Sequence, residues 1–186
     1  MSTKRQDILD SGLKLFAQYG FDTVPTSKVA EKANVGQGTI FRYFPTKDAL
    51  ILSLYKDLKA DAARHIMKGI SEEMAFEEQL FTCWNNIIEW NIKNQDAFRF
   101  TEQYANSPYA TQATKEEATS YFASFFGLLE KGIKEQKIKQ MPLFMIQVLI
   151  YGITNSLSKM SLYFGKKITK SDIRLSFDCF WNSIKA

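Results

Sequence analysis

Apolar residues recur at the three- and four-residue spacing of α-helices along most of the chain, and no stretch alternates apolar and polar residues as a strand does. The first helical pattern covers residues 4–19 and is followed by Gly20, a residue typical of helix ends. From residue 72 onward, only Pro108 and Pro142 interrupt the pattern. The sequence therefore predicts an all-α protein with about nine helices.

Residues 25–47 predict two short helices joined by a tight turn, which is a helix-turn-helix motif. Thr26 occupies the N-cap position of the first helix, where a hydroxyl accepts a hydrogen bond from the first turn. Asn34 tolerates the left-handed conformation that ends a helix, and Gly36 can cap the next helix, at about residues 37–44. Together with the helix at residues 4–19, these two helices form a predicted three-helix N-terminal domain.

The second short helix has two different faces. Ile40 and Phe44 lie four residues apart and are expected to point inward. The outward positions are Gln37, Thr39, Arg42 and Tyr43. Glutamine suits the edge of adenine, and arginine suits guanine or phosphate. Gly38 would let DNA approach the backbone, and Lys47 at the start of the next helix would meet a phosphate, so we expect this region to contact double-stranded DNA.

The residues around this helix resemble the signature of the tetracycline-repressor (TetR) family of bacterial regulators, roughly A-G-V-S-x-G-T-x-Y-x-Y-F-x-x-K. Here the stretch is A-N-V-G-Q-G-T-I-F-R-Y-F-P-T-K, with I-L-D-S-G-L-K-L-F-A-Q-Y-G-F upstream and K-D-A-L downstream. The resemblance covers roughly the first 55 residues. Asn34 replaces the usual glycine, Gly36 the usual serine, and Phe41 the usual tyrosine, whose hydroxyl often touches phosphate in the family.

The resemblance implies a DNA-binding domain at residues 1–46 and a ligand-binding and dimerisation domain at residues 47–186. It further implies a ligand-responsive transcriptional regulator, usually a repressor, that binds a palindromic operator as a dimer and is released by a small-molecule effector. The DNA-binding residues expected on this basis are Thr26, Ser27, Gln37, Gly38, Thr39, Phe41, Arg42, Tyr43 and Lys47.

A long helix is predicted at residues 47–68, with Thr46 as its cap, and at this length it would span roughly 30 Å and could link two domains. The later helices, including one predicted at residues 111–137, are rich in aromatic residues, which suits a pocket for a small, largely apolar effector. For any one aromatic residue, plain core packing is the commoner role. The residues expected to line the pocket are Trp84, Ile88, Phe100, Tyr104, Tyr121, Phe125 and Tyr151.

The last two predicted helices suggest pairing of two subunits. Residues 143–164 are apolar on more than one face and need cover on every side. A helix capped by Thr169 then carries a continuous apolar stripe, formed by Ile173, Phe177, Phe180, Trp181 and Ile184. We therefore expect a homodimer through the last two helices, with burial wholly inside one monomer as the alternative.

Composition and charge do not identify a function, but they argue against some kinds of functional site. The formal charge is +4, and residues 1–60 hold nine Lys and Arg against six Asp and Glu, so the modest basic excess lies mostly on the helix-turn-helix side. Two isolated cysteines and a single histidine, His65, offer no metal-ligand spacing and no catalytic constellation. We expect no metal site, no cofactor and no catalytic residues, and hence no enzyme.

The chain is also expected to remain in the cytoplasm without a membrane span. Its N-terminus lacks the apolar run of a signal peptide, and the hydrophobic stretch at residues 143–153 is interrupted and followed by polar residues. The alternative function left open by the sequence is an all-helical protein-interaction or enzymatic domain that binds no operator.

Overall fold

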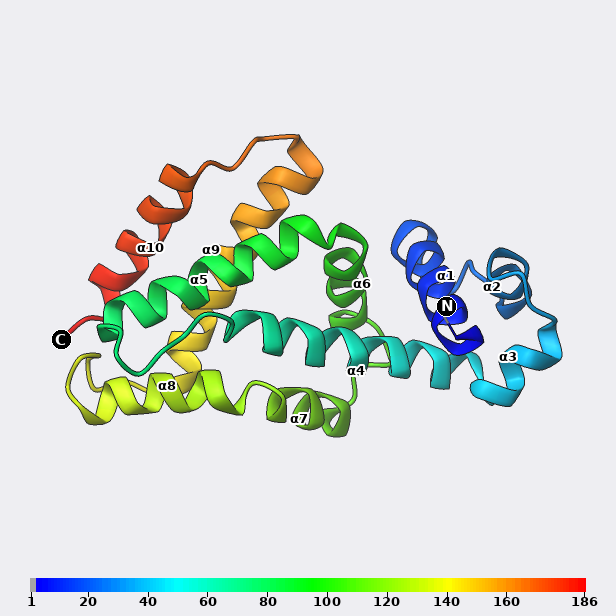
Figure 1. Cartoon of the computed structure of the whole chain (residues 1–186), viewed down its shortest axis with the longest axis horizontal. Helices are drawn as coiled ribbons and strands as arrows, with labels where there is room; N and C mark the ends of the chain where they lie inside the picture. The colour runs from blue at the N-terminus through cyan, green and yellow to red at the C-terminus, as the bar shows by residue number, and fades with distance from the viewer. Residues whose placement is uncertain (1–2) are drawn as a thin grey trace. The chain divides into compact units, whose positions relative to one another are not determined.

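The structure, a computed structural model, describes residues 3–186 and contains ten helices within this range, with no strand beyond one isolated bridge (Figure 1). The helices are α1 (Lys4–Tyr19), α2 (Thr26–Lys32), α3 (Gln37–Tyr43), α4 (Lys47–Ile66), α5 (Phe76–Lys93), α6 (Gln95–Ala105), α7 (Gln112–Ser120), α8 (Ala123–Lys134), α9 (Leu143–Phe164) and α10 (Lys170–Ile184). The all-α prediction is confirmed, with ten helices in place of about nine.

The additional helix arises because the helix predicted at residues 111–137 is two helices, α7 and α8. The chain turns between Ser120 and Ala123, where the backbone N–H of Phe122 donates to the carbonyl of Thr119 at 3.0 Å. No proline or glycine marks this break. Instead, α7 is polar and contains several threonine and serine residues, which form helices less readily than alanine or leucine.

The described chain forms two compact units. The N-terminal unit contains the chain up to residue 59 together with residues 94–118, and the C-terminal unit contains residues 60–93 and 119–186. Helix α4 contributes residues to both units. The functional division at residues 46 and 47 that we expect from the sequence stays a prediction.

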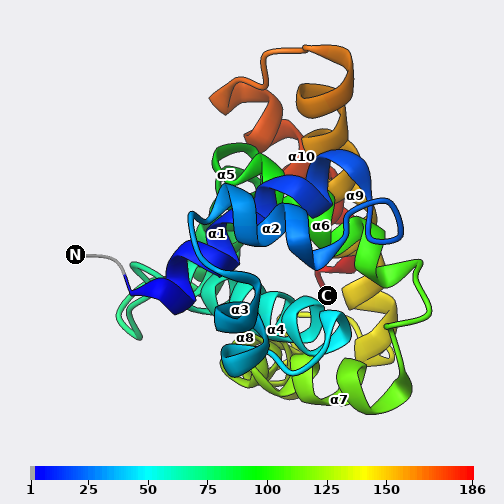
Figure 2. The same ribbon diagram turned by 90° about the vertical axis from the view of Figure 1, so that its right-hand side faces the viewer.

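The N-terminal unit is built around α1, which packs against α2, α3 and α6 (Figure 2). Its core includes Phe16, Val29 and Leu50, all essentially inaccessible to solvent. Helix α6 joins this core through Phe100, whose ring lies 5.1 Å from that of Phe21 in an edge-to-face arrangement. The sequence between residues 95 and 105 therefore belongs structurally with the helix-turn-helix.

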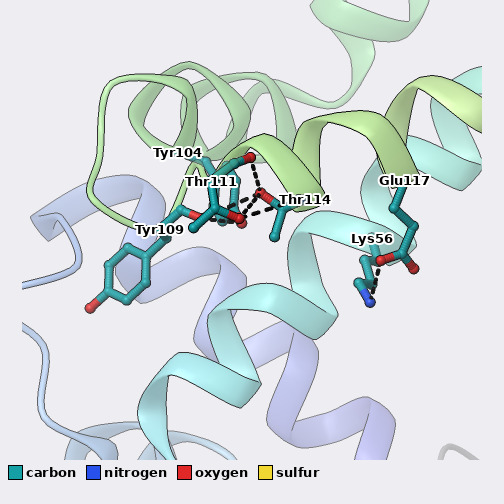
Figure 3. Close-up of polar contacts among 6 residues, drawn as sticks. All are labelled: Lys56, Tyr104, Tyr109, Thr111, Thr114 and Glu117. Atoms are coloured by element: carbon teal, nitrogen blue, oxygen red, sulfur yellow. Dashed lines mark hydrogen bonds and ion pairs between the residues drawn. The ribbon is translucent and has the colours of Figure 1, made fainter.

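The loop after α6 is fixed to the same unit by a small polar network (Figure 3). The Tyr104 hydroxyl donates to the carbonyl of Tyr109 at 2.8 Å, and the Tyr104 ring stacks on Tyr55 of α4 at 3.8 Å. Burial, and then the neighbouring Tyr104, raise the pKa of Tyr55. An ion pair of 2.7 Å between Lys56 and Glu117 joins α7 to α4.

The C-terminal unit is organised by α5, which contacts both α9 and α10 (Figure 1). The Trp84 ring of α5 stacks on Phe180 of α10 at 4.7 Å, and its indole N–H donates to Ser176 at 3.0 Å. Phe177 and Phe180 are fully buried. The expectation that the apolar stripe of α10 faces a second subunit is therefore wrong for these residues, because the stripe packs on α5 of its own chain.

Helix α9 has the two apolar faces that its sequence predicts. One face, which includes Ile146 and Ile150, lies in the core of the C-terminal unit, whereas the other remains exposed. Pro142 and Gly165 bound the helix as expected, and Gly165 takes the left-handed conformation that ends it, with φ of 65°. Among the described residues, no helix combines the length and apolar character needed to cross a membrane.

Candidate nucleic-acid interface

The turn between α2 and α3 follows the sequence prediction with one correction. Asn34 adopts the left-handed conformation, with φ of 52°, and Gly36 is the N-cap of α3. Thr26, however, is not a cap. It is the first residue of α2 and Pro25 is the N-cap, because the extended backbone of Pro25 already directs its carbonyl to the N–H of Lys28, at 3.1 Å.

Helix α3 presents two faces as predicted. Ile40 and Phe44 are buried at 0% and 4% exposure, and they anchor α3 to the core of the N-terminal unit. The opposite face is open to solvent. The Arg42 guanidinium lies 5.4 Å from the centre of the Tyr43 ring, a distance at which cation and ring attract each other. The remaining outward residues are Gln37, Gly38, Thr39 and Phe41. Thr39 is half-buried, and the other three are exposed.

The start of α4 is capped as the sequence predicts. The Thr46 hydroxyl accepts a hydrogen bond from the backbone N–H of Ala49 at 3.0 Å, which confirms Thr46 as the N-terminal cap. Lys47, half-buried, follows in the first turn. Thr26 and Ser27 occupy the start of α2. All nine residues predicted to bind DNA thus belong to one unit, on α2, α3 and the first turn of α4.

Tyr109, in the loop after α6, is affected by two acidic residues of the N-terminal unit. Burial raises the pKa of the Tyr109 hydroxyl, and the carboxylates of Asp48 and Asp22 raise it further. The Tyr109 ring packs edge-to-face on Phe21, 5.6 Å away. The loop that follows α6 therefore reaches the segment between α1 and α2, a contact that the local sequence pattern does not predict.

Arg5 makes contacts in this unit that the sequence pattern does not predict. Arg5, in the first turn of α1, donates to the hydroxyl of Ser53 at 2.8 Å and lies 3.5 Å from a carboxylate oxygen of Asp57. Its guanidinium also lies 5.5 Å from the centre of the Phe44 ring. No local signal could have indicated this role, because all three partners lie far along the chain from Arg5.

The residues predicted to line an effector pocket are distributed over both units. Trp84, Ile88 and Phe125 are buried together in the core of the C-terminal unit, and Tyr121, half-buried, belongs to the same unit. Phe100 and Tyr104 are buried in the core of the N-terminal unit. Tyr151 is 57% exposed on the outer face of α9. The structure therefore brings only the first group of these residues together.

The thiols offer little chemistry. Cys83 is buried and Cys179 is exposed, and they form no disulfide. Burial raises the pKa of the Cys83 thiol to about 12, so the nucleophilic thiolate is essentially absent at neutral pH. Among the described residues, no group of three or more His, Cys, Asp and Glu side chains is arranged to hold a metal ion.

Helix α3, the second helix of the helix-turn-helix, exposes amide, hydroxyl and guanidinium groups. This arrangement is typical of helix-turn-helix DNA-binding proteins. The family model of bacterial regulatory proteins of the tetR family matches residues 8–54, and that of the tetracyclin repressor-like C-terminal domain matches residues 75–185. The second match alone covers more than half of the chain. The chain belongs to the TetR family of bacterial regulatory proteins, a family of transcriptional regulators and not of enzymes.

Two curated relatives illustrate the similarity in sequence. The HTH-type transcriptional regulator YuxN of Bacillus subtilis is 34% identical over 93 residues, which are 48% of this chain and 32% of YuxN. This chain therefore matches about a third of the length of YuxN. The fatty acid metabolism regulator protein of Bacillus subtilis is 24% identical over 139 residues, which are 74% of this chain and 72% of that protein.

Two solved structures illustrate the similarity in fold. A TetR family transcription regulator from Shewanella sp. PV-4 has a TM-score of 0.90 and 24% identity, and the match covers 100% of both chains. The transcriptional regulator FadR from Bacillus subtilis, solved in complex with stearoyl-CoA, has a TM-score of 0.75 and 18% identity, with 95% of both chains covered. At these identities, the similarity shows the shared fold.

Proposed function

We propose that this protein is a ligand-responsive repressor that binds a palindromic operator as a homodimer and is released by a small, largely apolar effector. The main support for this proposal is the exposed face of α3, which carries Gln37, Arg42 and Tyr43. On the opposite face, Ile40 and Phe44 are buried in the core of the N-terminal unit. Such side chains form hydrogen bonds to base edges in the major groove, and phosphate contacts at the helix starts would set their register.

Dimerisation is supported by the outer face of α9. Its large apolar side chains remain exposed in the single chain, and one further residue, Leu175 of α10, is 64% exposed. Several large apolar side chains exposed on one helix are typical of an interaction site in a soluble protein. The exposed residues of α9 are Phe144, Met145, Val148, Tyr151, Met160, Tyr163 and Phe164. In this proposal, Tyr151 belongs to the subunit interface rather than to the effector pocket.

The effector proposal rests on the aromatic core of the C-terminal unit and on the relatives. Trp84, Ile88 and Phe125 offer an apolar environment for part of a ligand, and Tyr121 lies four residues before Phe125 in sequence. One relative is a fatty acid metabolism regulator, and one protein of the same fold was solved with stearoyl-CoA. We therefore propose long acyl chains as the first class of effector to test.

The test starts with a random-sequence DNA library, from which the protein selects the duplexes that it binds. We expect the selected sequences to be palindromic, with half-sites about one helical turn, 34 to 36 Å, apart. Mobility shifts with such a duplex should then weaken when stearoyl-CoA is added, with decanol and free coenzyme A as apolar and polar controls. Selection of no sequence, or of sequences without symmetry, would contradict the proposed dimeric operator.

A further inference from the structure

Arg5 connects three helices of the N-terminal unit through one side chain. It belongs to α1, its guanidinium lies over the ring of Phe44 at the end of α3, and it reaches two residues of α4. These two residues, Ser53 and Asp57, are one helical turn apart, and the same Nη2 atom lies 2.8 Å from the hydroxyl of the first and 3.5 Å from the carboxylate of the second. We call Arg5 and these three partners the Arg5 clamp.

The Arg5 clamp contacts the C-terminal end of α3. Helix α3 has only seven residues, and Phe44 is its C-cap, with a backbone N–H that donates to the carbonyl of Ile40 at 2.8 Å. Phe44 is 4% exposed, so its ring holds the end of α3 in the core. A cation that is fixed to α4 and lies on this ring therefore restrains α3 relative to α4.

We propose that Arg5 is a positioning residue for sequence-specific DNA binding. It orients the outward face of α3 through Phe44 rather than through a contact with DNA, while its Nη2 atom is held by Ser53 and Asp57 of α4. The inference rests on the proposed role of α3 as the helix that contacts bases. It adds to that role a residue outside the helix-turn-helix motif.

The expected effect is moderate, because the side chains of Arg5 and Asp57 are both about half exposed. Losing the clamp lowers the fraction of protein in which α3 has the DNA-ready orientation, and the apparent affinity falls by the same factor. Exposed ion pairs and cation–ring contacts of this kind correspond to a loss of about threefold to tenfold. A contact with phosphate would behave differently, because it contributes equally on every sequence.

Asp57→Asn is the sharpest variant for this test. Removing an acidic charge from a DNA-binding unit ordinarily strengthens its attraction to phosphates. The clamp predicts the opposite for the specific duplex, since Arg5 loses a partner. Asp10→Asn is the matched control, because Asp10 is an exposed carboxylate on α1 whose hydrogen bond, 2.8 Å from Gln6, stays within that helix.

The experiment measures the affinity of the full chain for a duplex selected by the wild type and for a scrambled duplex of the same composition, over a range of salt concentrations. We expect Arg5→Ala and Asp57→Asn each to weaken binding to the selected duplex by about threefold to tenfold, with an unchanged salt slope. Combined, they should lose no more than Arg5→Ala alone, because Arg5→Ala already removes the contact that Asp57→Asn weakens. Asp57→Asn should bind the scrambled duplex at least as well as the wild type.

The clamp is overturned if Asp57→Asn binds the selected duplex as tightly as Asp10→Asn does. It is also overturned if Arg5→Ala weakens binding to both duplexes equally and lowers the salt slope by about 1, the result for a direct phosphate contact. Arg42→Ala serves as the reference: if it has no effect, the role of α3 itself fails. Thermal unfolding checks the fold, and if Arg5→Ala proves unstable, Asp57→Asn and Ser53→Ala decide the question.

Discussion

At the scale of single residues, Arg42 and Lys47 are expected to contribute to DNA binding in different ways. Arg42 projects from the exposed face of α3, whereas Lys47 lies in the first turn of α4, at a helix N-terminus of the kind that favours phosphate. Arg42→Ala should cost about 1 to 3 kcal/mol and relax specificity at one operator position. Lys47→Ala should weaken all sequences alike and lower the salt slope by about 1.

Binding to single-base variants of the selected duplex, at several salt concentrations, distinguishes these two effects. Lys134→Ala is a suitable control, because Lys134 is an exposed cation on α8 in the C-terminal unit. Both DNA-site variants should leave the oligomeric state unchanged. If neither substitution alters affinity, α3 and the start of α4 do not form the DNA-binding surface.

Gly132 predicts a stability effect that needs no DNA. A methyl group at this buried position of α8 would lie 2.9 Å from the side chain of Ile138 and closer still to the ring of Phe76, so the neighbours would have to shift. Overpacking of this kind costs about 1 to 3 kcal/mol of unfolding free energy. Gly127→Ala, on the same helix and with open space around it, should instead be neutral or stabilise by up to about 1 kcal/mol. Denaturant unfolding of both variants measures the difference, and equal stabilities would refute the packing argument.

At the scale of helices, the clearest sequence predictions came from residues that end or cap them. Pro142 and Gly165 bound α9 as predicted, and the capping box of Thr169 with Asp172 starts α10. The Asp172 carboxylate accepts hydrogen bonds from Thr169, which lower its pKa. Such signals are local, so they can be recognised without knowing the fold.

The failures at this scale have a common physical cause. A periodic apolar stripe predicts that one face of a helix is buried, but it does not identify the residues on which that face packs. The stripe of α10 packs on Trp84 of its own chain, and Phe100 of α6 packs on Phe21. Both pairings join residues far apart in sequence, which periodicity alone cannot reveal. The faces of α3 were predicted because the helix is short and the motif itself is specific.

The exposed face of α9 leads to a prediction about assembly. Val148 and Tyr151 are each 57% exposed in the single chain, so charged residues there should not disturb the fold. We expect Val148→Glu combined with Tyr151→Glu to convert a dimer into monomers, because the introduced charges would be buried without partners in the interface. Charged residues at Phe177 would instead disrupt the core of the C-terminal unit.

Sedimentation at micromolar concentration measures this change. Ser124→Glu introduces one such charge at an exposed position of α8, a different helix, and should leave the dimer intact. A monomeric wild type, or a doubly charged variant that remains dimeric, would show that α9 does not form the interface.

At the scale of the whole molecule, the proposal requires a connection between effector binding and DNA release. Helix α4 carries Lys47 at its first turn, and it contributes residues to both compact units. Residues 94–118 connect α5 to α8 in sequence, yet they fold with the N-terminal unit. We propose that effector binding in the C-terminal unit changes the separation of the two α3 helices in the dimer. The effector can shift this equilibrium only by its differential affinity, usually about 1 to 3 kcal/mol.

The most direct test measures the distance between spin labels on the two copies of the N-terminal unit in the dimer. A cysteine introduced at Lys32, exposed on α2, carries the label, after Cys83 and Cys179 are replaced by serine. With the selected duplex, we expect one narrow distance distribution, and with stearoyl-CoA a shifted or broader one, together with loss of DNA binding. If stearoyl-CoA releases the DNA while the distribution keeps its centre and width, the proposed change of spacing is wrong.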